Sequence, residues 1–303
     1  MEVTGLVLNT LFTGLKVTFN KRFGEAKPIW PQIAMSVTST GRANVYANMG
    51  EVPGMREWIG DKTISKYSGE AYTIVNKSYE STIEVKRDDI EDDQIGIYGN
   101  MSMDLADVAA SKPDELIASL LNDGFTKKCY DGKAFFATDH KTDSGTYSNK
   151  GTKKLKYGTL AEIEGSLGVG MLSASELKRA DGSPSGLKYD TLIVPEALRT
   201  TAKLLTEAEF CSDGETPNPY RNELKYVVNP WLTSKDSWYL EVSGRAYKPF
   251  ILQIRRAPAM VSQVDMNSAD VFDRAVYKYG VEARWGAGYG PWTLAYGSNG
   301  TVA

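Results

Sequence analysis

Residues 56–98 read REWIGDKTISKYSGEAYTIVNKSYESTIEVKRDDIEDDQIGIY. Two polar, strand-like runs, 63–75 and 79–87, follow one another here, and in both of them large apolar residues alternate with Thr, Ser, Lys and Glu. That two-residue period is typical of strands with one covered face. A two-stranded ribbon is only marginally stable alone in water. We therefore expect the two runs to form a ribbon that lies on another surface, and the expected surface is a neighbouring copy of the same chain.

An acidic run, residues 87–93, follows the ribbon and precedes a helical pattern that extends from about residue 94 to Gly124. Carboxylates at the start of a helix accept hydrogen bonds from its unpaired N–H groups and match the positive end of its dipole. A calcium loop needs alternating oxygen ligands and a Gly-centred turn, and this run has neither. We therefore expect the acidic residues to cap the long helix: Asp88, Asp89, Asp92 and Asp93.

The rest of the pattern indicates an α+β chain. Within residues 3–24 the pattern fits either a short amphipathic helix followed by an extended arm or an ordinary first core helix. Further helices are expected within 158–180 and 195–205. Strands are expected at 187–195, 223–232, 237–243, 249–258 and 271–297. Strands and helices do not alternate regularly, which argues against a doubly wound sheet. The Gly-rich stretch 286–290 lacks the Lys-Ser/Thr of a phosphate loop, so we expect a bulged or bent strand there.

Composition excludes several classes of function. The chain has 303 residues, a formal net charge of −3 and no run of Lys or Arg longer than two, which disfavours a tight nucleic-acid binder. No stretch of about 18 apolar residues is present, so no membrane span is expected. Cys129 and Cys211 lie in no motif, and we expect free thiols in a reducing cytoplasm. The 17 Tyr and 6 Trp suit half-buried surfaces, both in interfaces and in β-rich proteins.

The sequence contains no specific catalytic, cofactor-binding or metal-binding motif. His140 is the only histidine, so a Ser-His-Asp or Cys-His mechanism would have to use it, with Asp139 or Asp143 beside it. No Gly-x-Ser-x-Gly turn is present, and a zinc site would need more His or Cys ligands. We expect a structural turn histidine and no enzyme activity; a hydrolase using His140 and Asp139 is kept as an alternative.

Four strings, in order over most of the chain, carry a resemblance to a known family. They are RDDIEDD (87–93), YDGKAFFATDH (130–140), KYDTLIVP (188–195) and YGVEARWGAGYG (279–290). With them the chain resembles the major head (capsid) subunits of Mu-like bacteriophages and prophages. The resemblance implies the HK97 fold of tailed-phage capsids.

By position, the resemblance divides the chain into five parts. They are an N-terminal arm (1–55), an extended E-loop hairpin (56–87), a first part of the P-domain with a long spine helix (88–150), an A-domain (151–248) and a second part of the P-domain (249–303). The E-loop would lie over an adjacent subunit. Aromatic side chains often dominate interfaces, and the expected contacts are Trp58, Tyr67, Tyr72 and Tyr79.

The function that the resemblance implies is self-assembly into an icosahedral head shell around double-stranded DNA. The partners would be other copies in hexamers and pentamers, a separate scaffold, a maturation protease and the portal, with DNA near the wall without specific binding. The protein would assemble in the bacterial cytoplasm and reside in the virion. Another phage structural protein, a tail or decoration subunit, is the second alternative, and the long helix with the arm and ribbon argues against it.

Overall fold

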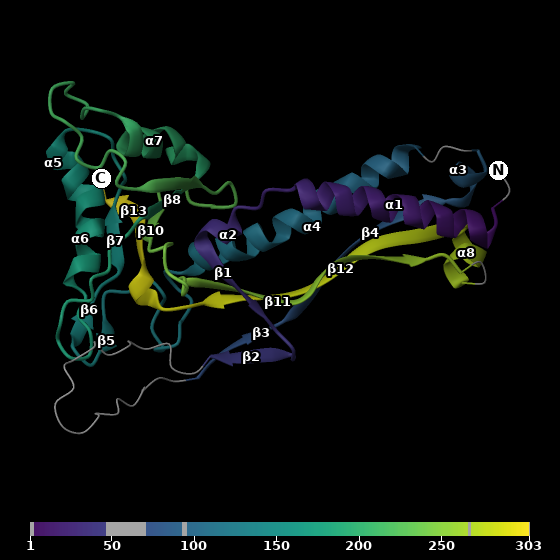
Figure 1. Cartoon of the computed structure of the whole chain (residues 1–303), viewed down its shortest axis with the longest axis horizontal. Helices are drawn as coiled ribbons and strands as arrows, with labels where there is room; N and C mark the ends of the chain where they lie inside the picture. Colours follow the sequence, from purple (N-terminus) through teal and green to yellow (C-terminus); the bar gives the residue numbers. More distant parts are fainter. Residues whose placement is uncertain (1–2, 47–70, 93–95, 266–267, 303) are drawn as a thin grey trace.

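The chain folds around two sheets that lie end to end in an elongated molecule (Figure 1). The structure is a computed structural model and describes residues 3–46, 71–92, 96–265 and 268–302. One end is a compact lobe built on a five-stranded sheet, and the other is a long four-stranded sheet with two helices along it. None of the described helices is both long enough and apolar enough to cross a membrane.

The long sheet has the strand order β1-β11-β12-β4. Its centre is an antiparallel pair of long strands, β11 (Phe250–Gln263) and β12 (Val276–Tyr289), which the short helix α8 (Ala269–Arg274) joins at the far end. The edges are β1 (Ala34–Thr38), parallel to β11, and β4 (Lys77–Lys86), antiparallel to β12. Alternate residues of β12 are buried on one face, including Tyr277, Tyr279 and Val281.

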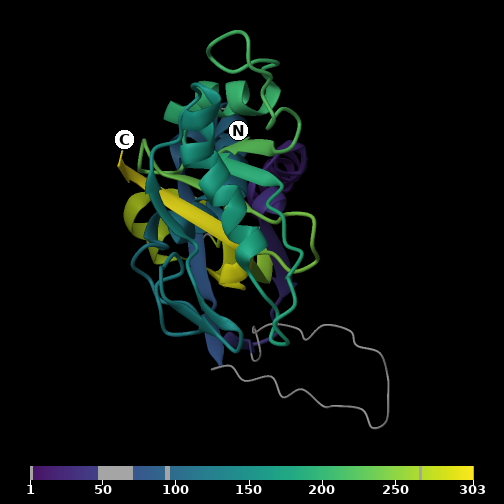
Figure 2. The ribbon, with the colours of Figure 1, turned by 90° about the vertical axis from the view of Figure 1, so that its left-hand side faces the viewer.

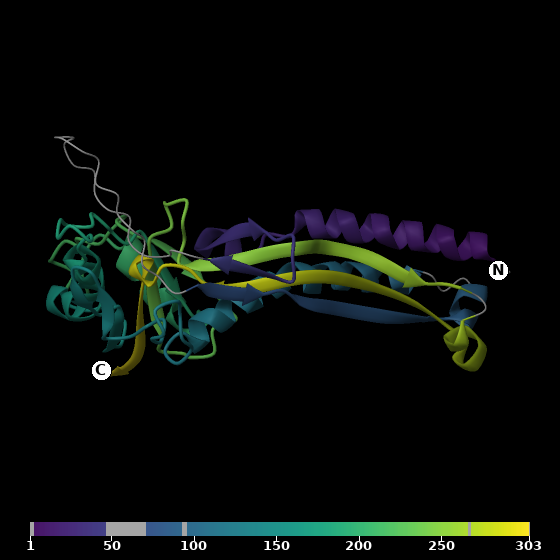
Figure 3. The ribbon, with the colours of Figure 1, turned by 90° about the horizontal axis from the view of Figure 1, so that it is seen from below.

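Two long helices, α1 (Gly5–Glu25) and α4 (Gly96–Asp123), cover that face, and Figure 3 shows α1 running along the sheet. Phe12 of α1 stacks on Tyr279 with ring centroids 6.1 Å apart, and the Ser102 hydroxyl of α4 donates to the Leu15 carbonyl at 2.8 Å. The buried stripe Leu8, Leu11, Leu15 and Phe19 continues through α1. Of the two interpretations of residues 3–24, the first core helix is confirmed and the short helix with an extended arm is wrong, because the apolar stripe is buried along the length of α1.

The prediction of a long helix near 94–124 is confirmed by α4, which continues through Pro113. Ser111 and Asp114, which resemble a capping box in the sequence, start no second helix. The Asp114 carboxylate instead accepts hydrogen bonds from the N–H groups of Ile29 and Trp30, at 2.9 and 2.6 Å, and so caps the short helix α2 (Trp30–Ile33).

Within the described residues, the two runs predicted to form a ribbon do not pair with each other. The described part of the first run is β3 (Tyr72–Val75), which pairs with β2 (Ala43–Tyr46). The second run is β4, which pairs with β12 along its whole length, from Lys77 opposite Trp285 to Lys86 opposite Val276. The apolar side of β4, with Val85 buried, therefore packs on helices of its own chain. It needs no neighbouring subunit to cover it. Residues 47–70 lie outside the described part of the chain.

The acidic run is also placed differently from the prediction. Asp88 and Asp89 lie in the first turn of a separate five-residue helix, α3 (Arg87–Glu91), and Asp92 is the residue that ends it. Asp93 lies outside the described residues. Asp88 and Asp89 thus lie at the start of α3, while the capping of α4 by Asp92 and Asp93 stays a prediction, because residues 93–95 lie outside the described part of the chain. Asp89 still contacts α4, because its carboxylate accepts a hydrogen bond from the Tyr98 hydroxyl.

The lobe sheet has the order β7-β13-β10-β8-β9 and faces the viewer in Figure 2. Its strands are β7 (Lys150–Lys153), β13 (Ala295–Val302), β10 (Trp238–Glu241), β8 (Thr191–Val194) and β9 (Lys225–Val228). One face packs on helices α5 (Leu160–Ile163), α6 (Val169–Glu176) and α7 (Arg199–Glu207). A π-helical turn, Glu164–Gly168, links α5 to α6, and single 3-10 turns, Glu196–Leu198 and Trp292–Leu294, precede α7 and β13.

The last strand, β13, belongs to the lobe sheet. It pairs with β10 and β7 of the lobe. The turn at Trp292–Leu294 directs the chain out of the long sheet after Tyr289. Tyr296 of β13 is buried in the core of the lobe, and Ala295 is buried in the cluster that the lobe shares with Phe250 of the long sheet.

Candidate assembly surfaces and the His140 cluster

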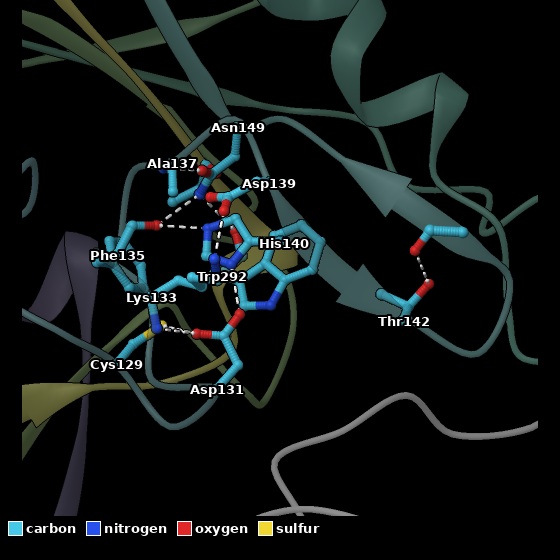
Figure 4. Close-up of polar contacts among 12 residues, drawn as sticks. Cys129, Asp131, Lys133, Phe135, Ala137, Asp139, His140, Thr142, Asn149 and Trp292 are labelled. Carbon is cyan, nitrogen blue, oxygen red and sulfur yellow. Dashed lines mark hydrogen bonds and ion pairs between the residues drawn. The ribbon is translucent and has the colours of Figure 1, made fainter.

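His140 lies in a buried hydrogen-bonded cluster at the start of β5 (His140–Thr142), which forms a small hairpin with β6 (Gly145–Tyr147) (Figure 4). Its Nδ1 is 2.5 Å from Asp131 Oδ2, and its Nε2 is 3.2 Å from the Phe135 carbonyl. The imidazole also stacks on the Trp292 ring, with centroids 4.1 Å apart and 7° between the planes. These contacts leave the side chain 0% exposed.

Asp131 is the centre of this cluster. Its carboxylate accepts hydrogen bonds from the Cys129 thiol at 3.1 Å and from the Lys133 N–H at 3.0 Å, in addition to the contact with His140. Burial would raise the pKa of Asp131, but these hydrogen bonds lower it below its ordinary value. Burial and the neighbouring carboxylate raise the pKa of Cys129, which keeps the thiol protonated and unreactive.

Among the described residues, these three side chains form the one cluster with enough neighbouring ligand atoms for a metal ion. Cys129, Asp131 and His140 present ligand atoms that all lie within 4.8 Å of one another. Zinc bonds to nitrogen and oxygen are about 2.0 Å long, so two ligands of one ion stand well over 2.5 Å apart. The Nδ1–Oδ2 distance is that of a direct hydrogen bond between the two side chains. The cluster therefore ties the loop before β5 to Trp292.

The hydrolase alternative fails on the same geometry. Asp139, its proposed partner, is exposed and pairs with Lys133. His140 itself is enclosed by Asp131, Phe135 and Trp292, so no substrate can reach either ring nitrogen. The prediction of a structural histidine is consistent with this burial.

Two of the four aromatic residues predicted to contact a neighbouring subunit are described, and both contact their own chain. The Tyr72 hydroxyl accepts a hydrogen bond from the Tyr289 N–H at 3.3 Å. The centroid of the Tyr79 ring lies 5.7 Å from that of Trp285, and the Lys112 ammonium lies over the Tyr79 ring, 5.7 Å from its centroid. Trp58 and Tyr67 lie outside the described residues.

The Gly-rich stretch of β12 is where the β2–β3 hairpin meets the long sheet. A Cβ atom on Gly288 would come within 2.4 Å of Ile74 Cδ1, and one on Gly286 within 3.0 Å of Asn76 Oδ1. The predicted bulge does not occur at Gly286–Tyr289, because β12 pairs regularly with β11 there; the register shifts lie beyond Ile254 of β11. The glycines instead allow β3 to lie close against the sheet.

Polar side chains hold the base of this hairpin. The Asn76 amide donates to the Ser39 hydroxyl at 2.7 Å, and that hydroxyl donates to Asn44 Oδ1 at 2.7 Å. The Gln253 amide of β11 donates to the Ile74 carbonyl at 3.0 Å. The residues on either side of 47–70 are thereby fixed to the long sheet.

The far end of the long sheet presents exposed apolar side chains that sequence reasoning did not identify. Phe272 of α8 is 89% exposed, and Leu6 of α1 is 78% exposed. Figure 1 places α8 and the start of α1 at the same end of the molecule, opposite the lobe. Asp270 holds α8 in place through ion pairs with Arg274 and Lys278. The sequence pattern missed Phe272 because the stretch 271–297 was predicted to be a continuous strand.

Comparison with known proteins gives consistent matches over the whole chain. The family model of the Mu-like prophage major head subunit gpT matches residues 8–161, 165–232 and 233–303. The Mu-like prophage FluMu major head subunit of Haemophilus influenzae is 30% identical over 301 residues, 99% of this chain and 76% of that protein. The major capsid protein of Escherichia phage Mu is 29% identical over 302 residues, 100% of this chain and 76% of that protein.

A solved structure shows the same fold. A chain of the procapsid of bacteriophage JBD30 matches with a TM-score of 0.62 and 27% identity, over 98% of this chain and 76% of that chain. The fold is thus the HK97-like fold of phage capsids. The matches leave no support for an enzyme. This chain belongs to the family of Mu-like prophage major head subunits, and it is a capsid protein.

Proposed function

We propose that this capsid subunit forms an icosahedral shell of hexamers and pentamers around double-stranded DNA. The observation that carries the proposal is the exposed apolar end of the long sheet, where Phe272 and Leu6 project from ordered helices. Large side chains that are exposed on a rigid support suit contacts that become buried on association. The elongated shape lets one subunit reach several neighbours, as rings and closed shells require (Figure 1).

We assign the capsid domains to the observed elements as follows. The lobe corresponds to the A-domain, and the long sheet with α4 corresponds to the P-domain. The E-loop corresponds to β2, β3 and the residues between them, so its limits move from 56–87 to 43–75. Trp58 and Tyr67 within these limits are the proposed contacts with an adjacent subunit, since Tyr72 and Tyr79 are engaged in their own chain.

We propose other copies of the chain as the main partners, with a separate scaffold, a maturation protease and a portal during assembly in the bacterial cytoplasm. The formal net charge of −3 supports passive proximity to the packaged DNA, because a basic wall would bind the DNA and hinder its release.

The contact at the sheet end is tested by Phe272→Ser, with Val17→Ser as a matched control. Val17 is 63% exposed but lies in the middle of α1, away from that end. Burying a phenyl ring is worth about 1.5–3 kcal/mol, or roughly tenfold to hundredfold in an association constant. We expect Phe272→Ser to raise the threshold concentration for particle formation by about that factor, in light scattering and electron microscopy.

The unfolding of the unassembled Phe272→Ser subunit should match that of the wild type, because the side chain has few contacts within the chain. Val17→Ser should leave both measurements unchanged. Normal particle formation by Phe272→Ser would rule out the contact. Replacement of residues 47–70 by a short Gly-Ser linker tests the E-loop separately: the subunit should fold but assemble poorly, and normal shells would contradict the assignment.

A further inference from the structure

Glu241 is a buried acid whose carboxyl group has no hydrogen-bond partner among the described residues. It is the last residue of β10, the middle strand of the lobe sheet, and lies opposite Ala295 of β13 and Thr191 of β8. Its exposed fraction is 0%. Removal from water without a partner strongly disfavours a carboxylate, so burial raises the pKa of Glu241 well above its ordinary value. Glu241 is therefore a neutral acid in this conformation.

Glu241 faces the junction between the lobe and the long sheet. Side chains alternate along a strand, so Glu241 shares its face with Tyr239 and not with Trp238 or Leu240. Tyr239 packs on Phe125 and Phe136, in the same apolar cluster as Phe250 at the start of β11. A charge at Glu241 would thus appear where the two sheets meet.

Among the described residues, two charged groups influence the ionisation of Glu241: Asp190 and Lys248. Asp190 directly precedes β8, and its carboxylate accepts hydrogen bonds from the N–H groups of Ser243 at 2.8 Å and Gly244 at 3.0 Å. Asp190 is therefore satisfied as an anion and opposes ionisation of Glu241. Lys248, in the segment between β10 and β11, favours it.

Lys248 is engaged elsewhere in this conformation. Its ammonium donates to the carbonyls of Pro31 and Gln32 in α2, at 2.8 Å each. α2 is four residues long, and Asp114 of α4 holds its other end. Lys248 thus links α2 to the chain that connects the lobe to the long sheet, in addition to the pairing of β1 with β11.

We propose that Glu241 and Lys248 form a proton-linked latch at this junction. While Glu241 is neutral, Lys248 holds the C-terminal half of α2; when Glu241 releases its proton to solvent, Lys248 turns to the new carboxylate and α2 loses the hydrogen bonds from Lys248. A lysine ammonium on a flexible stem can exchange one set of acceptors for another, and a buried carboxylate strongly favours such a partner. The latch couples protonation to the attachment of the N-terminal segment, which goes beyond the assembly function.

The test uses the full chain and the variant Glu241→Gln, which keeps the shape of the neutral acid. Glu196→Gln is the matched control, because Glu196 is an exposed carboxylate of the same lobe, paired with Arg199. Infrared spectroscopy at neutral pH should show the carbonyl band of a protonated carboxyl group in the wild type and in Glu196→Gln, and its loss in Glu241→Gln. Retention of the whole band in Glu241→Gln would overturn the proposal.

Hydrogen exchange reports on the latch itself. The Gln32 and Ala34 amides bond to the carbonyls of Ile29 and Trp30, so their protection factors follow the integrity of α2. In the wild type and in Glu196→Gln these factors should fall by up to about tenfold per pH unit once Glu241 ionises. They should stay level in Glu241→Gln, and Lys248→Met should lower them at every pH. A wild type that keeps full protection to about pH 10, where an ordinary lysine titrates, or an equal fall in Glu241→Gln, would overturn the latch.

Discussion

The contact between Gly288 and Ile74 gives a prediction that follows directly from atomic distances. In Gly288→Ala the new methyl group would lie 2.4 Å from Ile74 Cδ1 and 2.5 Å from Cγ1. Both distances are far below van der Waals contact, so either Ile74 leaves its site or the hairpin lifts from the sheet. Ile74 is buried against Ile251, the residue that pairs with Gly288. Overpacking of this kind costs about 1–3 kcal/mol, and the burial that Ile74 would lose is worth a similar amount.

We therefore expect Gly288→Ala to lower the free energy of unfolding by about 1–3 kcal/mol, measured by urea unfolding of the unassembled subunit and followed by circular dichroism. The double variant with Ile74→Ala isolates the contact. Ile74→Ala alone should cost about 2–5 kcal/mol, and adding Gly288→Ala should cost little more, because the methyl group then occupies the vacated space.

The matched control is Gly14→Ala in the middle of α1, where a Cβ atom would meet nothing within 4 Å. It should raise stability by about 0.5–1 kcal/mol through helix propensity. The reasoning is refuted if Gly288→Ala unfolds like the wild type, or if the effects of Gly288→Ala and Ile74→Ala simply add.

Two further predictions concern charged groups. Arg22→Ala breaks an exposed bidentate pair with Asp107 and should change the urea midpoint only slightly, and unfolding at high salt should show a still smaller difference from the wild type. A large loss that persists in high salt would contradict this. In Asp131→Asn the loss should depend on pH. Because the folded pKa of Asp131 lies below its ordinary value, its contribution is fully present above about pH 4 and disappears as the pH falls through the folded pKa. The urea midpoints of Asp131→Asn and of the wild type should converge as the pH falls below about 4. A difference that stays the same at every pH would show that the Asp131 carboxylate does not stabilise the fold through its charge.

The sequence predicted the residues that form long, strongly periodic elements. The apolar repeat after residue 94 predicted α4, and the short apolar run before Pro195 predicted the buried strand β8. Both predictions succeeded because these elements are encoded by neighbouring residues. The order of four strings along the chain also indicated the family, which the comparisons then showed.

The candidate site could be predicted only in part. The single histidine and the missing motifs correctly disfavoured an enzyme. No local signal brings Trp292 onto His140, because these residues are far apart in the sequence. The exposure of Phe272 was equally hidden, since an apolar residue in a strand-like stretch is normally expected to be buried.

By itself, the sequence determined which segments are helical or extended and that one face of each is covered. Only the tertiary structure decided what covers them. The alternation in residues 79–87 would be the same if a second copy of the chain covered this strand. In the structure, β4 instead pairs with β12, with Lys77 opposite Trp285, and so lies against helices of its own chain. Likewise, Asp114 suits any helix start, and the fold assigned it to α2. A local pattern records that a contact is needed, while its partner is set by the packing of distant segments.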